Sequence, residues 1–169
     1  IPESLTCARQ MNESILGKRI KEVIVNQNPH GFAWFFGNHE EYPQMLTGKQ
    51  VGRSIGIGIM VQTEVEDLKI VLGDGFTIRY YEDLSKLPKK HQLYLIFDDD
   101  SALVCTVQMY GGMFVFREGE NQSPYYLVAL EKPFPLTEGF NFDYFMKIRE
   151  ETNANLSAKA FLATEQRIP

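Results

Sequence analysis

The chain has 169 residues, of which 44% are hydrophobic and 23% charged, with a formal net charge of −5. This composition is ordinary for a soluble globular protein. No apolar run approaches the roughly 20 residues of a membrane helix, and the N-terminus lacks a secretory signal, so we expect a cytoplasmic protein without a membrane partner. The negative charge excludes a strongly basic nucleic-acid binder, because Lys and Arg supply most non-specific affinity, so any DNA-facing surface must be local.

The two cysteines do not form a recognisable site. Cys7 and Cys105 lie far apart, and neither belongs to a C-x-x-C pair. The sequence therefore predicts neither a disulfide framework nor a metal site, and we interpret both residues as buried thiols.

The chain opens with a predicted helix over residues 4–16. Leu5, Ala8, Met11 and Ile15 recur at steps of three and four, which gives a single apolar stripe. Gly17 stands where helices commonly end in a left-handed conformation.

Short strands separated by turn residues dominate the middle of the chain. The aromatic stretch 32–36 is interpreted as core with Trp34 as its anchor, and a short helix is expected at 43–46. Closely spaced strands with such turns favour a β-sandwich or barrel. The strands are predicted over residues 20–25, 55–63, 68–72, 77–81, 93–97, 102–107 and 113–116, with turns at 73–75, 98–101, 111–112 and 118–121.

The pattern becomes helical after Pro135. Asn141 is a candidate cap for a helix that carries Phe142, Phe145 and Ile148 on one side, and a second helix is expected from Ser157. The predicted fold class is α+β, a two-layer antiparallel β-sandwich flanked by helices. The predicted domains are residues 1–133 and, for the first helices of a truncated helical domain, residues 134–169.

Four stretches, spread over nearly the whole chain, resemble the formamidopyrimidine-DNA glycosylase and endonuclease VIII family of base-repair enzymes. No stretch is specific alone, but their order and spacing match the family. They are Ile1-Pro2-Glu3 with Gly17-Lys18-Arg19-Ile20; Leu46-Thr47-Gly48-Lys49-Gln50-Val51 with Leu72-Gly73; Lys90-His91 before a strand; and Pro135-Leu136, Phe140, Tyr144-Phe145 and Ser157–Leu162 before Ile168.

The resemblance implies a base-excision-repair DNA glycosylase with possible AP lyase activity, which binds damaged double-stranded DNA and removes oxidised bases. The alternative is a catalytically inactive protein of the same fold that binds DNA or a protein partner. We expect a monomer without a small-molecule cofactor. The family's zinc finger is expected only beyond Pro169, where the resemblance implies a continuation.

The family chemistry uses an N-terminal proline amine followed by a glutamate. Pro2 follows Ile1, so its nitrogen is an amide and not a nucleophile, and the catalytic pair is expected upstream. Pro2 can instead simply start the first helix. Glu3 is the candidate catalytic residue, matching a family glutamate that faces the flipped base.

Other family positions are changed. The position of the catalytic strand lysine matches Ile59 or a neighbour, and that of the gap-filling methionine matches Asp74. Tyr110 falls where the family has its wedge, so it is a candidate for stacking on a base, although a tyrosine covering a hairpin is an equal alternative.

Two basic positions complete the candidate DNA contacts. Lys159 matches the family lysine that holds the phosphate beside the lesion, and the alternative is a solvated side chain. His91 resembles a family histidine near the DNA cleft, whereas a lone histidine at a strand edge is more often structural.

Overall fold

The computed structural model describes residues 2–73, 75–135, 137–165 and 167–168. The chain forms two compact units, Ile1–Asn121 and Gln122–Pro169. The sequence predictions that involve Ile1, Asp74, Leu136 and Pro169 lie outside the described residues. None of the described helices is long and apolar enough to cross a lipid bilayer.

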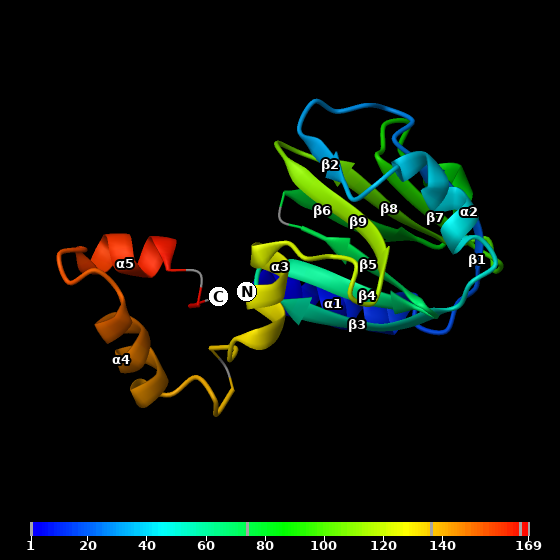
Figure 1. The fold of residues 1–169 in the computed structure, drawn as a ribbon. Helices are drawn as coiled ribbons and strands as arrows, with labels where there is room; N and C mark the ends of the chain where they lie inside the picture. The colour runs from blue at the N-terminus through cyan, green and yellow to red at the C-terminus, as the bar shows by residue number, and fades with distance from the viewer. Residues whose placement is uncertain (1, 74, 136, 166, 169) are drawn as a thin grey trace. The chain divides into compact units, whose positions relative to one another are not determined.

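The first unit is a two-layer sandwich (Figure 1). One sheet has the strand order β1-β7-β8-β6 and the other β2-β9-β5-β4-β3. All pairs are antiparallel except β2 with β9, which is parallel. The predicted α+β sandwich is therefore confirmed, with one mixed sheet. The elements are α1 (Pro2–Ser14), β1 (Ile20–Val25), β2 (Ala33–Phe35), η1 (His39–Glu41), α2 (Tyr42–Leu46), β3 (Val51–Ile57), β4 (Met60–Val65), β5 (Leu68–Leu72), β6 (Phe76–Tyr81), η2 (Leu84–Lys86), β7 (Leu93–Phe97), β8 (Ala102–Val107) and β9 (Gly111–Arg117).

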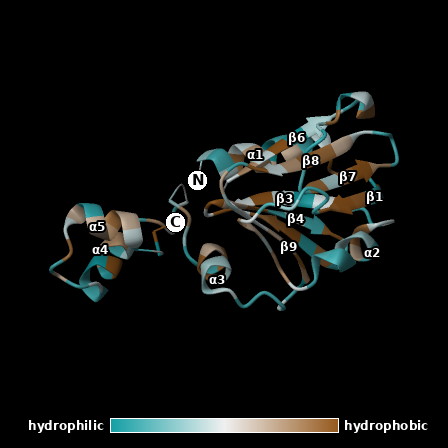
Figure 2. Cartoon of the chain, turned by 90° about the horizontal axis from the view of Figure 1, so that it is seen from above, coloured by the Kyte–Doolittle hydropathy of each residue, from teal (hydrophilic) through white to brown (hydrophobic). Residues whose placement is uncertain are grey.

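The core lies between the two sheets and reaches the buried stripe of α1. Figure 2 shows hydrophobic residues concentrated on the strands. Ala8 and Met11 of α1 and Ile15 just after it are buried in the same cluster as the inward side chains of both sheets, as the helical spacing predicts, whereas Leu5 of the predicted stripe is 37% exposed. Burial of this stripe fixes α1 against the sandwich.

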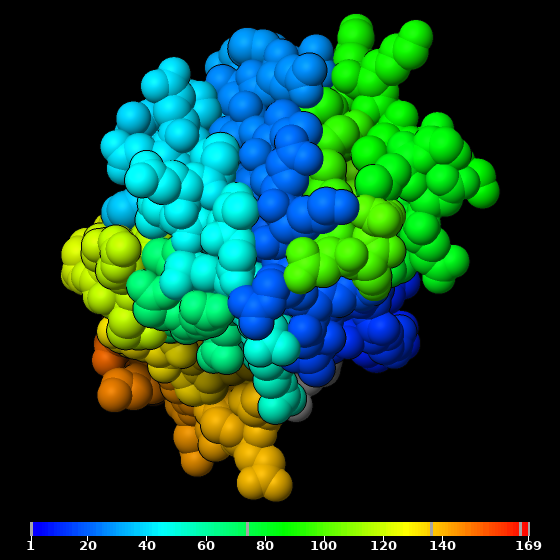
Figure 3. Space-filling view, turned by 90° about the vertical axis from the view of Figure 1, so that its right-hand side faces the viewer, coloured from blue at the N-terminus to red at the C-terminus, as the bar shows by residue number. Residues whose placement is uncertain are grey.

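Ion pairs join the start of β1 to the β7–β8 hairpin. Lys18 pairs with Asp99, and Lys21 pairs with Asp100 at 2.7 Å. The hydrogen bond from Lys18, helped by one from Ser101, lowers the pKa of Asp99 to about 2. Figure 3 shows the face on which segments near β1, α2 and this hairpin gather.

The single strand expected over 55–63 is wrong, because the chain turns there into a hairpin. β3 ends at Ile57 and β4 begins at Met60, with Ile57 paired to Met60 across a two-residue turn. Gly58 takes a positive φ of 54° in this turn. Glycine at the first central position suits such a tight hairpin. The turn was not predicted because the sequence stays apolar through it.

Two further sequence interpretations are also wrong. Gly111 and Gly112 belong to β9 rather than to a break, because they pair with Ala33 and Trp34 of β2. Trp34 is not a core anchor, since 53% of it is exposed.

The second unit contains α3 (Pro124–Glu131), α4 (Phe142–Glu151) and α5 (Ala158–Thr164). The predicted cap Asn141 is confirmed, since it accepts a hydrogen bond from the backbone of Tyr144, and the helix expected from Ser157 is present, with the Ser157 side chain accepting a hydrogen bond from Ala160. The sequence did not predict α3. This helix lies between the unit boundary after Asn121 and the predicted domain boundary at residue 133.

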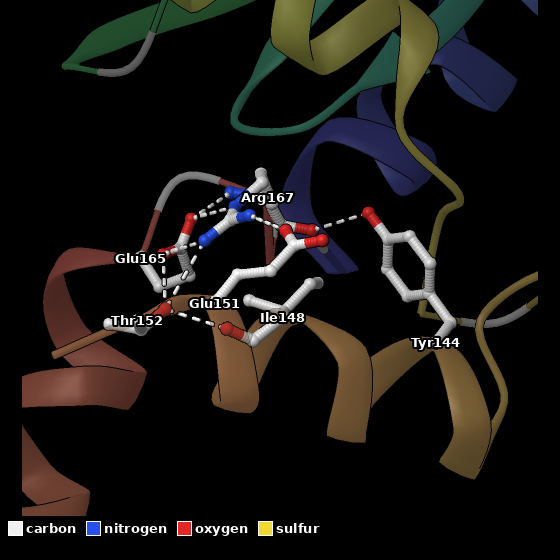
Figure 4. A network of polar contacts seen from close by, with 6 residues as sticks. All are labelled: Tyr144, Ile148, Glu151, Thr152, Glu165 and Arg167. Carbon is white, nitrogen blue, oxygen red and sulfur yellow. Dashed lines mark hydrogen bonds and ion pairs between the residues drawn. The ribbon is translucent and has the colours of Figure 1, made fainter. Parts of the chain in front are cut away.

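A polar network joins α4 to the segment after α5 (Figure 4). Arg167 pairs with Glu151 and Glu165, both at 2.7 Å. Thr152 donates a hydrogen bond to the Ile148 carbonyl at 2.7 Å and contacts Glu165 and Arg167 at 3.2 Å. The network holds the ends of the two helices together within this unit.

Candidate functional site

A pocket of about 450 Å³ lies in the first unit between the N-terminal half of α1 and strands β4, β5 and β6. It combines hydroxyl, amide and carboxyl groups from α1 with apolar side chains from the strands. Its lining residues are Glu3, Ser4, Thr6, Cys7, Gln10, Ile59, Val61, Leu72, Gly73, Gly75, Phe76, Thr77 and Ile78.

The start of α1 is fixed beside this pocket by close packing on the β3–β4 hairpin. The hydroxyl of Ser4 donates a hydrogen bond of 2.7 Å to the Gly58 carbonyl. A Cβ at Gly56 would lie 2.9 Å from the backbone nitrogen of Leu5, so the strand passes directly under the helix. Glu3 is therefore presented by a helix end with little freedom to shift.

Glu3 is exposed and lines the pocket. A hydrogen bond from its own backbone N–H is the largest effect that lowers the pKa of Glu3, so the carboxyl group is ionised at neutral pH. Burial raises the pKa of Cys7, so that thiol stays neutral. Glu3 can therefore accept a proton or stabilise a positive charge that develops in the pocket.

Ile59, which with its neighbours matches the position of the family lysine, lines the pocket. It occupies the second position of the β3–β4 turn, and 61% of it is exposed. Among the described residues that line the pocket, Glu3 and Cys7 are the ionisable ones, and neither supplies an amine. The pocket itself thus offers acid–base chemistry rather than an amine nucleophile.

Tyr110 borders the loop that forms one wall of the pocket. The Gln108 N–H donates to the Gly75 carbonyl at 3.1 Å, and the Gly73 N–H donates to the Gly112 carbonyl at 2.9 Å. A Cβ at Gly75 would lie only 1.8 Å from the Tyr110 carbonyl oxygen. Gly75 therefore lines the pocket together with Glu3 and also packs against the backbone of Tyr110.

His91 is buried, and its ring stacks on Tyr94 with a centroid distance of 3.4 Å. Its backbone N–H donates to the side chain of Asn28 at 3.1 Å. Burial lowers the pKa of His91, although the nearby carbonyl groups of Pro88 and Lys89 oppose this effect. This geometry favours the structural alternative, and a DNA contact by His91 stays a prediction.

Lys159 belongs to the second unit. It is exposed and is the second residue of α5, two residues after the capping residue Ser157. The structure describes no ion pair for it among the residues that it covers. Its contact with a DNA phosphate stays a prediction.

Sequence reasoning missed the exposed aromatic pair of Trp34 and Tyr110, whose ring centroids lie 6.2 Å apart. The signal that was missed is the alternation of side chains between the two faces of a strand. It places Phe32 and Trp34 on one face, while Phe35 on the other face packs against the core.

The fold described above is that of the N-terminal part of formamidopyrimidine-DNA glycosylases. The solved structure of the Lactococcus lactis enzyme bound to DNA with an abasic site has a TM-score of 0.71 and 21% identity, over 89% of this chain and 57% of that one. The same organism's enzyme with DNA containing FAPY-dG gives 0.72 and 22%, over 88% and 56%. MutM in complex with DNA containing carbocyclic 8-oxo-G gives 0.72 and 22%, over 89% and 56%.

These likenesses concern the fold, and the chain spans little more than half the length of the solved glycosylases. No protein-family model matches the sequence, and no curated protein matches it either.

Proposed function

We propose that this protein is a base-excision-repair glycosylase that binds damaged double-stranded DNA and removes an oxidised base extruded into the Glu3 pocket. The observation that carries the proposal is the pocket between α1 and the loop at Gly73 and Gly75. Its volume of about 450 Å³ falls within the range of small-molecule sites, and a base must leave the stack to be reached by an enzyme. The solved structures of the same fold are bound to damaged DNA.

The ionised Glu3 carboxylate suits hydrolysis of the bond between base and sugar. As that bond breaks, positive charge develops on the sugar, and a nearby carboxylate stabilises it. The same carboxylate can accept a proton from the attacking water. The hydroxyl groups of Thr6 and Thr77 and the amide of Gln10 offer hydrogen bonds for orienting the base.

A second candidate is a glycosylase-fold protein that binds DNA without catalysis. The presence of Ile59 in place of the family lysine favours it, because an isoleucine cannot donate or accept a proton. The two candidates predict the same affinity for an abasic-site duplex and differ in base release.

The test compares wild type with Glu3→Gln on a duplex that contains 8-oxoguanine, with base release measured by chromatography. We expect Glu3→Gln to lower the release rate by about 100-fold, the usual effect of losing a general base. Binding to an abasic-site duplex, measured by fluorescence anisotropy, should change by less than about twofold. Glu13→Gln, which alters an exposed carboxylate of the same helix paired with Arg9, is the matched control.

Each outcome has one interpretation. Binding without base release by wild type would leave the non-catalytic candidate, and no binding to either duplex would overturn both. Borohydride trapping adds the mechanism, because only a Schiff base becomes covalently linked to DNA. A trapped complex would point to an amine outside the described lining of the pocket, and base release without trapping would point to hydrolysis assisted by Glu3.

A further inference from the structure

Four large apolar side chains are exposed together at the end of the sandwich where β2 meets β9. They form what we call the aromatic patch: Phe32 (61% exposed), Trp34 (53%), Met109 (70%) and Tyr110 (43%). Single exposed hydrophobic residues are common, but exposed aromatic rings in contact with each other, as Trp34 and Tyr110 are, mark a binding surface.

The backbone holds the patch in a fixed arrangement. β2 pairs in parallel with β9, with Ala33 opposite Gly111 (Figure 1), and the Gly111 N–H donates to the Phe32 carbonyl at 3.0 Å. The rings of Trp34 and Tyr110 lie 6.2 Å apart at an interplanar angle of 38°. The ring of Trp34 on β2 and the ring of Tyr110 just before β9 are therefore exposed with little conformational freedom to lose on binding.

The patch is continuous with the Glu3 pocket. Tyr110 belongs to the patch, and its carbonyl oxygen packs directly against Gly75, which lines the pocket. A DNA strand that delivers a nucleotide to Glu3 would therefore pass over or beside Tyr110.

We propose that Trp34 extends the surface at Tyr110, the position that resembles the family's wedge, into a stacking platform for an unpaired nucleobase adjacent to the nucleotide held in the Glu3 pocket. This inference rests on the proposed function. Every base has a π-face, so stacking tolerates any sequence and does not require basic residues. That mode of binding suits a chain with a net charge of −5, for which phosphate neutralisation is weak.

Association with a second copy of the chain through the β2 edge is less favourable. β2 is only three residues long, and a short edge strand is a poor template for pairing with another chain. The exposed parts of the patch are rings and a thioether rather than a long strand edge, which fits a flat base better than a strand.

The sequence offers a direct probe, because Trp34 is the one tryptophan among its 169 residues. Titration with an abasic-site duplex should quench the fluorescence of Trp34 if a base stacks on its ring. An undamaged duplex of the same sequence, in which all bases are paired, should quench it much less at equal occupancy. Occupancy is followed separately by the anisotropy of a dye on the DNA.

Substitutions of Trp34 test how much its ring contributes to the affinity for DNA. We expect Trp34→Ala to weaken binding of the abasic-site duplex by about tenfold, as loss of a base-stacking aromatic does, and Trp34→Phe to restore most of the affinity. The slope of log Kd against log salt should stay unchanged, since no phosphate contact is lost. Leu16→Ala is the matched control, because Leu16 is also 53% exposed and lies in the same unit.

The outcomes separate the two proposals. Binding of damaged DNA without Trp34 quenching, and with Trp34→Ala as tight as wild type, would overturn the stacking platform and leave the proposed function intact. An absence of any DNA binding would overturn both. Concentration-dependent dimerisation that Trp34→Ala abolishes, without quenching by DNA, would assign the patch to a second copy and overturn the platform.

Discussion

At the scale of single residues, Gly75 connects the pocket with the aromatic patch, since it lines the one and its backbone packs against Tyr110 of the other. Its φ is +88°, a conformation that side chains with a Cβ disfavour, and a Cβ there would also collide with the Tyr110 carbonyl oxygen. Gly119 has a similar φ of +80° but open space around the Cβ position. Substitutions at the two glycines therefore distinguish the cost of backbone strain alone from the cost of strain together with a steric clash.

We expect Gly119→Ala to lower the free energy of unfolding by about 1 kcal/mol, the cost of a left-handed alanine. Gly75→Ala should cost about 2 kcal/mol more, because the Tyr110 backbone must also move. Urea unfolding followed by circular dichroism measures both, and a shift in Trp34 emission should accompany Gly75→Ala alone. Equal losses for the two variants would contradict the close packing of Gly75 on Tyr110.

How well the sequence predicts individual residues depends on whether the information is local. The cap Asn141 and the helix start at Ser157 are predicted correctly because a side chain and a backbone N–H three residues away determine them. The exposure of Trp34 was not predicted, because it depends on the pairing of β2 with β9, which are about 80 residues apart in the chain. Glu3 was selected by resemblance, and the pocket around it depends on strands that local patterns do not place.

At the scale of elements, strands bounded by turn residues are predicted to within a residue or two, as β5, β7 and β8 illustrate. The β3–β4 hairpin is missed because hydrophobicity continues through its two-residue turn, and α3 is missed although Pro124 stands at its first position. The order of strands within each sheet cannot be predicted from local sequence patterns, since none of them indicates that β6 pairs with β8 rather than with β5.

The α4–α5 network gives the second unit a specific dependence on pH. Hydrogen bonds from Arg167 lower the pKa of Glu165 to about 2, and the same contacts raise the pKa of Arg167, which stays protonated throughout the acidic range. A carboxyl group with a lowered pKa stabilises the fold above its unfolded value near 4.5, and this contribution is lost as the pH falls toward 2.

We therefore expect Glu165→Gln to reduce the protection of the α4 and α5 amides against hydrogen exchange at pH 6, by about 1 kcal/mol. The difference from wild type should shrink as the pH falls from 4.5 toward 2, where the wild-type carboxyl group is itself protonated. Glu150→Gln, which alters the exposed neighbour of Glu151, serves as the control. A constant difference across this range would show that the Glu165 charge does not contribute.

At the scale of the whole molecule, charge and shape contribute differently to the proposed DNA binding. With 17 basic and 22 acidic residues, the chain attracts phosphates only where basic side chains stand apart from acidic ones. Lys159 meets this condition as an exposed residue without an ion pair among the described residues, whereas Lys18, Lys21 and Lys49 are already paired with carboxylates. The predicted phosphate contact of Lys159 therefore has a measurable signature that differs from that of Trp34.

Lys159→Ala should weaken binding about equally for damaged and undamaged duplexes and lower the slope of log Kd against log salt by about 1, as loss of one phosphate contact requires. Trp34→Ala should instead weaken binding of damaged DNA with the slope unchanged. Lys147→Ala, at an exposed lysine of α4 in the same unit, controls for the simple loss of one positive charge. If Lys147→Ala and Lys159→Ala change affinity and slope equally, the effect is that of overall charge and no specific phosphate contact exists at Lys159. If only Lys159→Ala changes the slope, the second unit contributes a specific phosphate contact through Lys159.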